Sequence, residues 1–162
     1  MAINAISLGE ESDELAIIAA SVPDQPNAPT RVSASLSSIS ITWVAPDDGG
    51  SPLTNFVLYM NEGTGSNTFN VIDLSVDAGE TTYTKSGLTE GQEHRFILVA
   101  VNLVGPSLDS DESEDITVAV LPDSPGDPIY TASSETSMQF SWTSPVDAGR
   151  SNGGTDLAGY II

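Results

Sequence analysis

The chain has no cysteine, a single histidine (His94) and only four lysine and arginine residues among its 162. The absence of cysteine excludes a disulfide framework, a thiolate metal site and a cysteine nucleophile. One histidine is too few for a histidine-based triad or a typical zinc site. Against the four basic residues stand 23 Asp and Glu, which gives a formal net charge of −19. A chain this acidic is not expected to bind nucleic acid, because that needs a basic patch.

Long apolar runs and catalytic motifs are also missing. No apolar run approaches the length of about 18 residues that crosses a bilayer, so we expect no membrane insertion in this segment. The sequence contains no glycine-rich phosphate loop, no nucleophile elbow and no metal-spaced set of histidines or cysteines. It therefore predicts a protein that is not an enzyme.

The chain repeats itself at a spacing close to 100 residues. Trp43 in the sequence SITWVAP and Trp142 in QFSWTSP stand 99 residues apart. The segments Leu53–Leu58 (LTNFVL) and Leu157–Ile162 (LAGYII) match at a spacing of 104, so the second copy has an insertion in the glycine-rich loop before it. A period of this length is that of a domain and is longer than a solenoid unit.

The repeat defines the expected domain boundaries. Val22–Pro26 recurs as Leu121–Pro125, again 99 residues later, and lies at a junction between repeats each time. We expect residues 1–21 to be the C-terminal strands of a preceding repeat, 22–122 a complete repeat, and 123–162 the N-terminal strands of a following one. The chain is thus interpreted as part of a longer tandem array.

Within the complete repeat, apolar residues alternate with polar ones. Ser38–Trp43 places Ile39, Ile41 and Trp43 on one face, which is typical of a half-buried strand. Turn sequences separate this segment from the other short runs, and no stretch has a helical apolar stripe. Further strands are expected at Asn55–Met60, Thr81–Ser86, His94–Val101 and Ile116–Val120. Short strands at this spacing favour an antiparallel β-sandwich.

These strands resemble those of a fibronectin type III domain. The resemblance rests on a proline-rich start, on Trp43 followed by Pro46, on Phe56–Tyr59, and on an E–F signature that runs from Tyr83 and Leu88 to Asn102. It covers the complete repeat and both partial ones. It implies an all-β fold, a seven-stranded antiparallel β-sandwich of the fibronectin type III or immunoglobulin-like kind in a tandem array, used mostly as a spacer or adhesion module.

The resemblance assigns structural roles to five residues: Trp43, Tyr83, Leu88, His94 and Phe96. The family usually has tyrosine at the position of His94, where the hydroxyl ties strand F to the E–F loop backbone. We expect the imidazole N–H to make a similar bond, with a pH sensor or a metal ligand as the alternative. Lys85 stands where strand E usually points an apolar residue inward. Either its stem lies along the core edge or the register slips there.

The outward positions of two predicted strands are unusually apolar. If Phe56, Leu58, Phe96 and Leu98 point inward, their neighbours should face solvent and be polar. The neighbours are instead Val57, Tyr59, Ile97, Val99 and Val101, here called the outer-face residues. Strands C and F pair in this family, so the five should form one patch. Strand propensity alone is the alternative explanation, but a clustered apolar patch indicates a protein-contact face.

Acidic residues cluster at two equivalent places, Glu10–Glu14 and Asp109–Asp115. The second cluster offers Asp109, Asp111, Glu112, Glu114 and Asp115, whose carboxylates are the ligands that calcium prefers. The spacing does not match an EF-hand loop. We favour solvated charge that discourages edge pairing, with calcium as the alternative and no other cofactor.

Together these features predict a structural or interaction protein: a semi-rigid array of β-sandwiches that assembles through its apolar outer face, as part of a fibre, sheath or surface appendage. The expected partners are proteins, namely neighbouring repeats and other copies of the chain. The alternatives are a protein- or glycan-binding adhesion or receptor module, and spacer repeats of a larger enzyme. We expect an extracellular or cell-surface location, with an intracellular cytoskeletal or ciliary location as the alternative.

Overall fold

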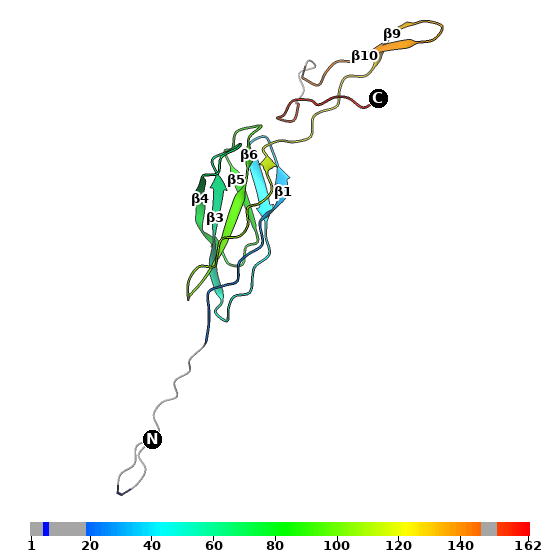
Figure 1. Cartoon of the computed structure of the whole chain (residues 1–162). Helices are drawn as coiled ribbons and strands as arrows, with labels where there is room; N and C mark the ends of the chain where they lie inside the picture. Colours follow the sequence, from blue (N-terminus) through cyan, green and yellow to red (C-terminus); the bar gives the residue numbers. More distant parts are fainter. Residues whose placement is uncertain (1–4, 7–18, 147–151) are drawn as a thin grey trace.

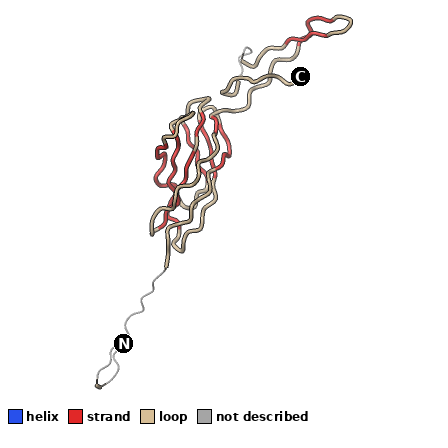
Figure 2. The backbone as a smooth tube through the Cα atoms, in the orientation of Figure 1, coloured by secondary structure: helices blue, strands red, loops and turns tan. Residues whose placement is uncertain are grey.

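The computed structural model describes residues 5–6, 19–146 and 152–162. The described residues form ten strands and no helix (Figures 1 and 2). No helix that could span a membrane is therefore found in this part of the chain. The strands are β1 (Thr30–Ala34), β2 (Ser38–Thr42), β3 (Leu53–Asn61), β4 (Phe69–Asp77), β5 (Thr82–Ser86), β6 (Glu93–His94), β7 (Phe96–Asn102), β8 (Ile116–Thr117), β9 (Ile129–Ser133) and β10 (Met138–Ser141).

Two three-stranded antiparallel sheets, β1-β2-β5 and β4-β3-β7, form the layers of a sandwich, and a short β6-β8 pair extends it. If β6 and β7 are counted as one strand interrupted at Arg95, the sandwich has seven strands. The predicted all-β, fibronectin-like fold class is confirmed. The core between the layers consists of Ile39, Ile41, Trp43, Phe56, Leu58, Val76, Phe96, Leu98, Ala100, Ile116 and Val118.

The core follows from the alternation of side chains along each strand. Ile39, Phe56, Leu58 and Leu98 have no exposed surface, because the sheets turn every second residue inward. The Trp43 ring meets the Phe56 ring edge-on, with the ring centroids 5.5 Å apart. This geometry suits the charge distribution of aromatic rings, and it ties β3 to the end of β2.

The sequence did not predict strand β4. It is an edge strand whose pairing with β3 shifts register on both sides of Leu58, so its apolar residues do not alternate regularly. Val71 and Leu74 of β4 are exposed. The final strand, expected over Ile116–Val120, is reduced to the two residues of β8.

Lys85 keeps the register of β5. The strand pairs with β2 without a shift, from Ser38 opposite Ser86 to Thr42 opposite Thr82. Lys85 lies opposite Ile39 and is half-buried. The alternative of a register slip is therefore wrong, and the half-buried lysine fits a stem that lies along the edge of the core.

The hairpin β9–β10 repeats the geometry of β1–β2 at a spacing of 99 residues. Thr30 opposite Thr42 corresponds to Ile129 opposite Ser141, and both hairpins shift register at the same place. The Trp142 ring meets that of Tyr160 edge-on at 5.3 Å, as Trp43 meets Phe56. Figure 1 places this hairpin beyond one end of the sandwich.

Side chains at the expected inward positions of the hairpin β9–β10 are exposed to solvent. Met138, Phe140 and Trp142 are 71%, 48% and 36% exposed, since β9 and β10 pair only with each other among the described strands. They line a groove of about 630 Å³ together with Tyr160 and Ile161. Most of segment 1–21, including the acidic cluster Glu10–Glu14, lies outside the described residues.

Candidate protein-contact face

Strand pairing brings the predicted outer-face residues together. Tyr59 of β3 lies opposite Ile97 of β7, and Val57 lies opposite Val99. Directly paired residues point to the same side of a sheet, and Val101 follows on that side two residues after Val99. All five outer-face residues therefore share the outer surface of the sheet β4-β3-β7.

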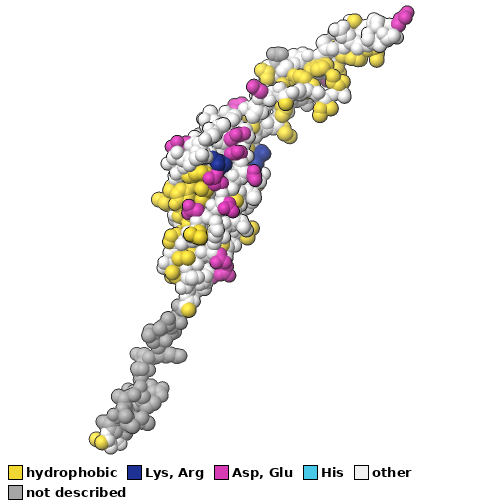
Figure 3. All heavy atoms as spheres, in the orientation of Figure 1, with side chains coloured by type: hydrophobic (Ala, Val, Ile, Leu, Met, Phe, Trp, Pro, Cys, Tyr) yellow, Lys and Arg dark blue, Asp and Glu magenta, His cyan; other side chains and the backbone are white. Residues whose placement is uncertain are grey.

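Strand β4 extends this surface. Val71 lies opposite Tyr59, so an apolar row crosses all three strands from Ile97 through Tyr59 to Val71. Val71 is 44% exposed, and Leu74 on the same strand is 68% exposed. Figure 3 shows hydrophobic side chains gathered on the β4 side of the sandwich. Sequence reasoning missed both β4 residues because it did not predict the strand.

The centre of the face is already covered by the chain itself. Val99 is only 5% exposed, whereas the other four outer-face residues are half-buried. The segment between β7 and β8 (residues 103–115) is here called the returning segment. Val99 lies between β3 and this segment, which bonds to β7 at Leu98 and Ala100, the residues on either side of Val99. The most accessible apolar surface is therefore displaced toward β4.

The returning segment carries three buried serines at a spacing of three, here called the serine ladder. Each serine N–H donates to a β7 carbonyl at 2.8–2.9 Å, and each hydroxyl accepts the N–H of that same β7 residue at 3.0 Å. Each hydroxyl then donates to the carbonyl of the residue that follows it. The three pairs are Ser107 with Ala100, Ser110 with Leu98, and Ser113 with Phe96.

The ladder explains the arrangement of the acidic cluster. Because the serines face β7, the intervening carboxylates of Asp109, Asp111, Glu112, Glu114 and Asp115 all lie on residues exposed to solvent. The described residues contain no group of three or more acidic or histidine side chains that could hold a metal ion. The regular serine spacing was visible in the sequence, but its meaning depends on the position of β7.

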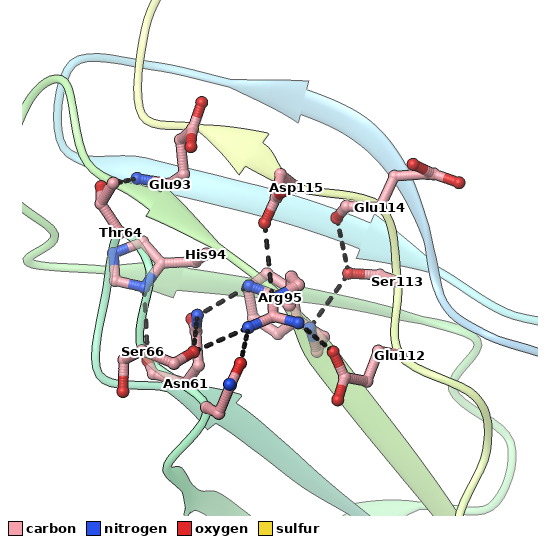
Figure 4. Close-up of polar contacts among 12 residues, drawn as sticks. Asn61, Thr64, Ser66, Glu93, His94, Arg95, Glu112, Ser113, Glu114 and Asp115 are labelled. Carbon is pink, nitrogen blue, oxygen red and sulfur yellow. Dashed lines mark hydrogen bonds and ion pairs between the residues drawn. The ribbon is translucent and has the colours of Figure 1, made fainter.

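Arg95, directly before β7, is the centre of a group of polar contacts (Figure 4). Its guanidinium lies over the Phe69 ring, 5.7 Å from the centroid. It also contacts the Glu112 carboxylate, Asp115 Oδ1 at 3.4 Å, the Ser66 carbonyl oxygen at 2.7 Å and Asn67 Oδ1 at 2.8 Å. Arg95 thus joins the acidic segment to the loop between β3 and β4.

His94 is buried and makes a different contact from the one expected. Its Nδ1 lies 3.3 Å from the Asn61 carbonyl oxygen at the end of β3, so the expected bond to the E–F loop backbone is not formed. A carbonyl can only accept, so Nδ1 carries the proton. The Asn61 side chain in turn accepts the Arg95 N–H at 3.0 Å. The shorter imidazole contacts the strand beside it, where a tyrosine would reach farther.

The remaining expected structural residues lie at or beside the core. Trp43 is 5% exposed and Phe96 is fully buried. Tyr83 and Leu88 are partly buried against the core cluster. Burial raises the pKa of the Tyr83 phenol, and the nearby Asp73 carboxylate raises it further.

The fold can now be compared with known families. A model of the fibronectin type III domain matches residues 24–117. The chain belongs to the fibronectin type III family. The resemblance inferred from the sequence is thereby confirmed.

Relatives of this fibronectin type III chain are long proteins. It is 33% identical to mouse protein sidekick-2 over 144 residues, which cover 85% of this chain and 6% of that protein. It is 32% identical to human myomesin-2 over 171 residues, which cover 99% of this chain and 11% of that protein. The chain therefore spans about a tenth or less of these relatives.

Solved structures show the same fold. The crystal structure of domains A168-A170 from titin is 30% identical, with a TM-score of 0.55, and the match covers 61% of this chain and 33% of that one. A single titin module from human cardiac muscle is 26% identical, with a TM-score of 0.53. That match covers 60% of this chain and 94% of the module.

Proposed function

We propose that this fibronectin type III chain is a non-enzymatic structural and interaction protein. Its sandwiches would be arranged in tandem, and the outer surface of the sheet β4-β3-β7 would contact another protein. The contact surface consists of the outer-face residues with Val71 and Leu74 of β4. The observation that carries the proposal is the difference between the outer surfaces of the two sheets.

The outer surface of the sheet β1-β2-β5 is polar over β2 and β5. Its outward positions on β2 and β5 are occupied by hydroxyl side chains, and the Ser40 hydroxyl bonds to that of Thr84 at 2.8 Å. These positions pair directly as Ser38 with Ser86, Ser40 with Thr84, and Thr42 with Thr82. Threonine and valine are both good strand formers. Strand propensity therefore does not explain why one sheet is polar outside and the other apolar.

The tandem arrangement is supported by the two matching hairpins. Because β9–β10 reproduces the register of β1–β2, we assign residues 123–162 to the N-terminal strands of a following repeat. Residues 22–122 form the complete repeat, and 1–21 the C-terminal strands of a preceding one. The near-complete match to a single titin module supports the central assignment.

We propose another copy of the chain as the partner of the apolar surface, as in a fibre or sheath outside the cell or at its surface. An intracellular cytoskeletal array is the alternative location. An adhesion or receptor module that binds a different protein is the alternative function. Removing an apolar side chain from water contributes about 1.5–3 kcal/mol before association costs, so several together suffice for a contact repeated along an array.

Sedimentation of the purified chain at micromolar concentration tests this proposal. We expect self-association that Tyr59→Lys combined with Val71→Lys abolishes, because two ammonium groups would have to be buried in the contact. The matched control is Ser40→Lys with Thr84→Lys, which places the same charges on the polar sheet and should leave association unchanged. Circular dichroism checks that both variants remain folded.

Salt provides a second readout. Two copies that each carry a formal charge of −19 repel one another. An apolar contact should therefore strengthen as the salt concentration rises toward about 0.15 M, because exposed charges more than about 8 Å apart are then largely screened from one another. A chain that stays monomeric under all conditions would contradict self-association and leave the receptor-like function.

A further inference from the structure

The ends of two repeats make the same backbone contact. The Ser21 N–H donates to the Gly49 carbonyl at 2.9 Å, and the Val120 N–H donates to the Gly153 carbonyl at 2.8 Å. Ser21 and Val120 are equivalent residues at the 99-residue spacing, and the two glycines are equivalent at the 104-residue spacing. In both places, a residue close to the end of one repeat bonds to the glycine-rich loop that follows the second strand of the next.

Only glycine fits at these contacts. Gly49 and Gly153 have φ angles of 67° and 82°, in the left-handed region that side chains disfavour. A Cβ atom on Gly49 would lie 2.7 Å from the carbonyl oxygens of Ser21 and Val22, and one on Gly153 would lie 2.2 Å from that of Val120. The close approach of the connecting segment thus requires the absence of a side chain.

The second glycine of each pair repeats the pattern. Gly50 and Gly154 have φ angles of 84° and 91°. The Gly50 N–H donates to Asp48 Oδ1 at 2.8 Å, and the Gly154 N–H donates to Asn152 Oδ1 at 3.1 Å. The same backbone conformation at the glycine pair is therefore supported twice by different side chains.

The loop that contains Gly153 and Gly154 also lies against the complete repeat. A Cβ atom on Gly154 would be 2.9 Å from Glu90 Cγ and 3.2 Å from Leu36 Cδ2, and one on Gly91 would be 3.0 Å from the Gly154 carbonyl oxygen. Leu36 lies in the turn between β1 and β2, and Glu90 and Gly91 lie between β5 and β6. The contact thus involves two loops of the sandwich besides the connecting segment.

At the junction before the complete repeat, the buried side-chain amide of Asn102 holds the connecting segment around Ser21 in place. The Asn102 side chain is 4% exposed, and its Nδ2 donates to the Ser21 carbonyl at 2.7 Å and to the Asp48 carbonyl at 2.8 Å. The Asp24 N–H adds a bond to the Asp47 carbonyl at 3.0 Å. The connecting segment is therefore fastened to the loop on both sides of Val22.

We propose that each glycine pair, Gly49–Gly50 and Gly153–Gly154, is a docking surface for the end of the preceding repeat and fixes the angle between consecutive sandwiches. The array would then be a rod with the same joint at every repeat, in place of flexibly linked domains. This inference rests on the tandem arrangement proposed above, but it does not depend on the apolar outer face. Failure of self-association would leave it intact.

Amide hydrogen exchange measured by NMR on the 162-residue chain tests the joint. We expect the Ser21 and Val120 amides to exchange at least tenfold more slowly than in an unstructured peptide. Gly49→Ala should remove the protection of Ser21 alone, and Gly153→Ala that of Val120 alone. Residual dipolar couplings should report a fixed orientation across Val120 that Gly153→Ala abolishes.

Gly87→Ala is the matched control. Gly87 has a comparable φ of 76°, but a Cβ atom there would meet nothing within 4 Å. It carries the same backbone cost without the close approach, so both amides should stay protected. The proposal is overturned if the two amides exchange freely in the unaltered chain, or if they remain protected in both joint variants.

Discussion

Ser110 and Leu98 bond to each other twice: the Ser110 N–H donates to the Leu98 carbonyl at 2.9 Å, and the Leu98 N–H donates to the Ser110 hydroxyl at 3.0 Å. The Ser110 hydroxyl thus accepts the Leu98 N–H in place of the backbone carbonyl of a regular neighbouring strand. An irregular segment thereby covers the free edge of β7 without leaving polar backbone groups unpaired.

The first prediction concerns this pair. Ser110→Ala should lower the free energy of unfolding by about 1–3 kcal/mol, because the buried Leu98 N–H loses its acceptor. Chemical denaturation measures the loss. Ser86→Ala, at an exposed position of β5, should change stability by no more than about 0.5 kcal/mol. Equal effects of the two substitutions would show that the ladder bond contributes nothing.

The second prediction separates two members of the apolar surface. Val99→Lys should destabilise the fold by several kcal/mol, since Val99 is 5% exposed and an unpaired ammonium there would be buried. Val71→Lys, on a residue 44% exposed, should be nearly neutral. Thermal unfolding of the two variants measures the contrast. Similar melting temperatures would mean that the returning segment does not cover Val99.

The third prediction concerns alkaline pH. The pKa of Tyr83 is raised above 10.0, first by burial and then by the Asp73 carboxylate. The folded chain therefore keeps the phenol proton at a pH where the unfolded chain has lost it, so stability is full below pH 10 and falls above it.

Denaturation at a series of pH values around and above 10 checks this, with Tyr83→Phe as the comparison. The variant cannot titrate at this position, so its stability should fall less steeply with pH than that of the unaltered chain. Parallel curves for the unaltered chain and the Tyr83→Phe variant would refute the raised pKa.

Much of the fold could be predicted from the sequence because side-chain alternation is a local property. The pattern around Ile39 and Ile41 needs only the period of a strand to place both in the core. Strand β4 could not be found in this way, since its register shifts beside Leu58 remove the alternation. The candidate face could be predicted on β3 and β7 because both strands keep the alternation of side chains. Its extension to Val71 was missed because β4 does not.

The sequence by itself determined the family, the repeat near 100 residues, the core positions and the apolar rows on two strands. Only the tertiary structure decided which partner each polar group has. Ser110 bonds to β7, His94 contacts Asn61, and Gly153 receives Val120. These contacts join residues far apart along the chain, so local periodicity carries no information about them. Packing of the strands brings these groups within hydrogen-bonding distance, and most buried polar groups find a partner in this way, although Trp43 Nε1 and His94 Nε2 do not.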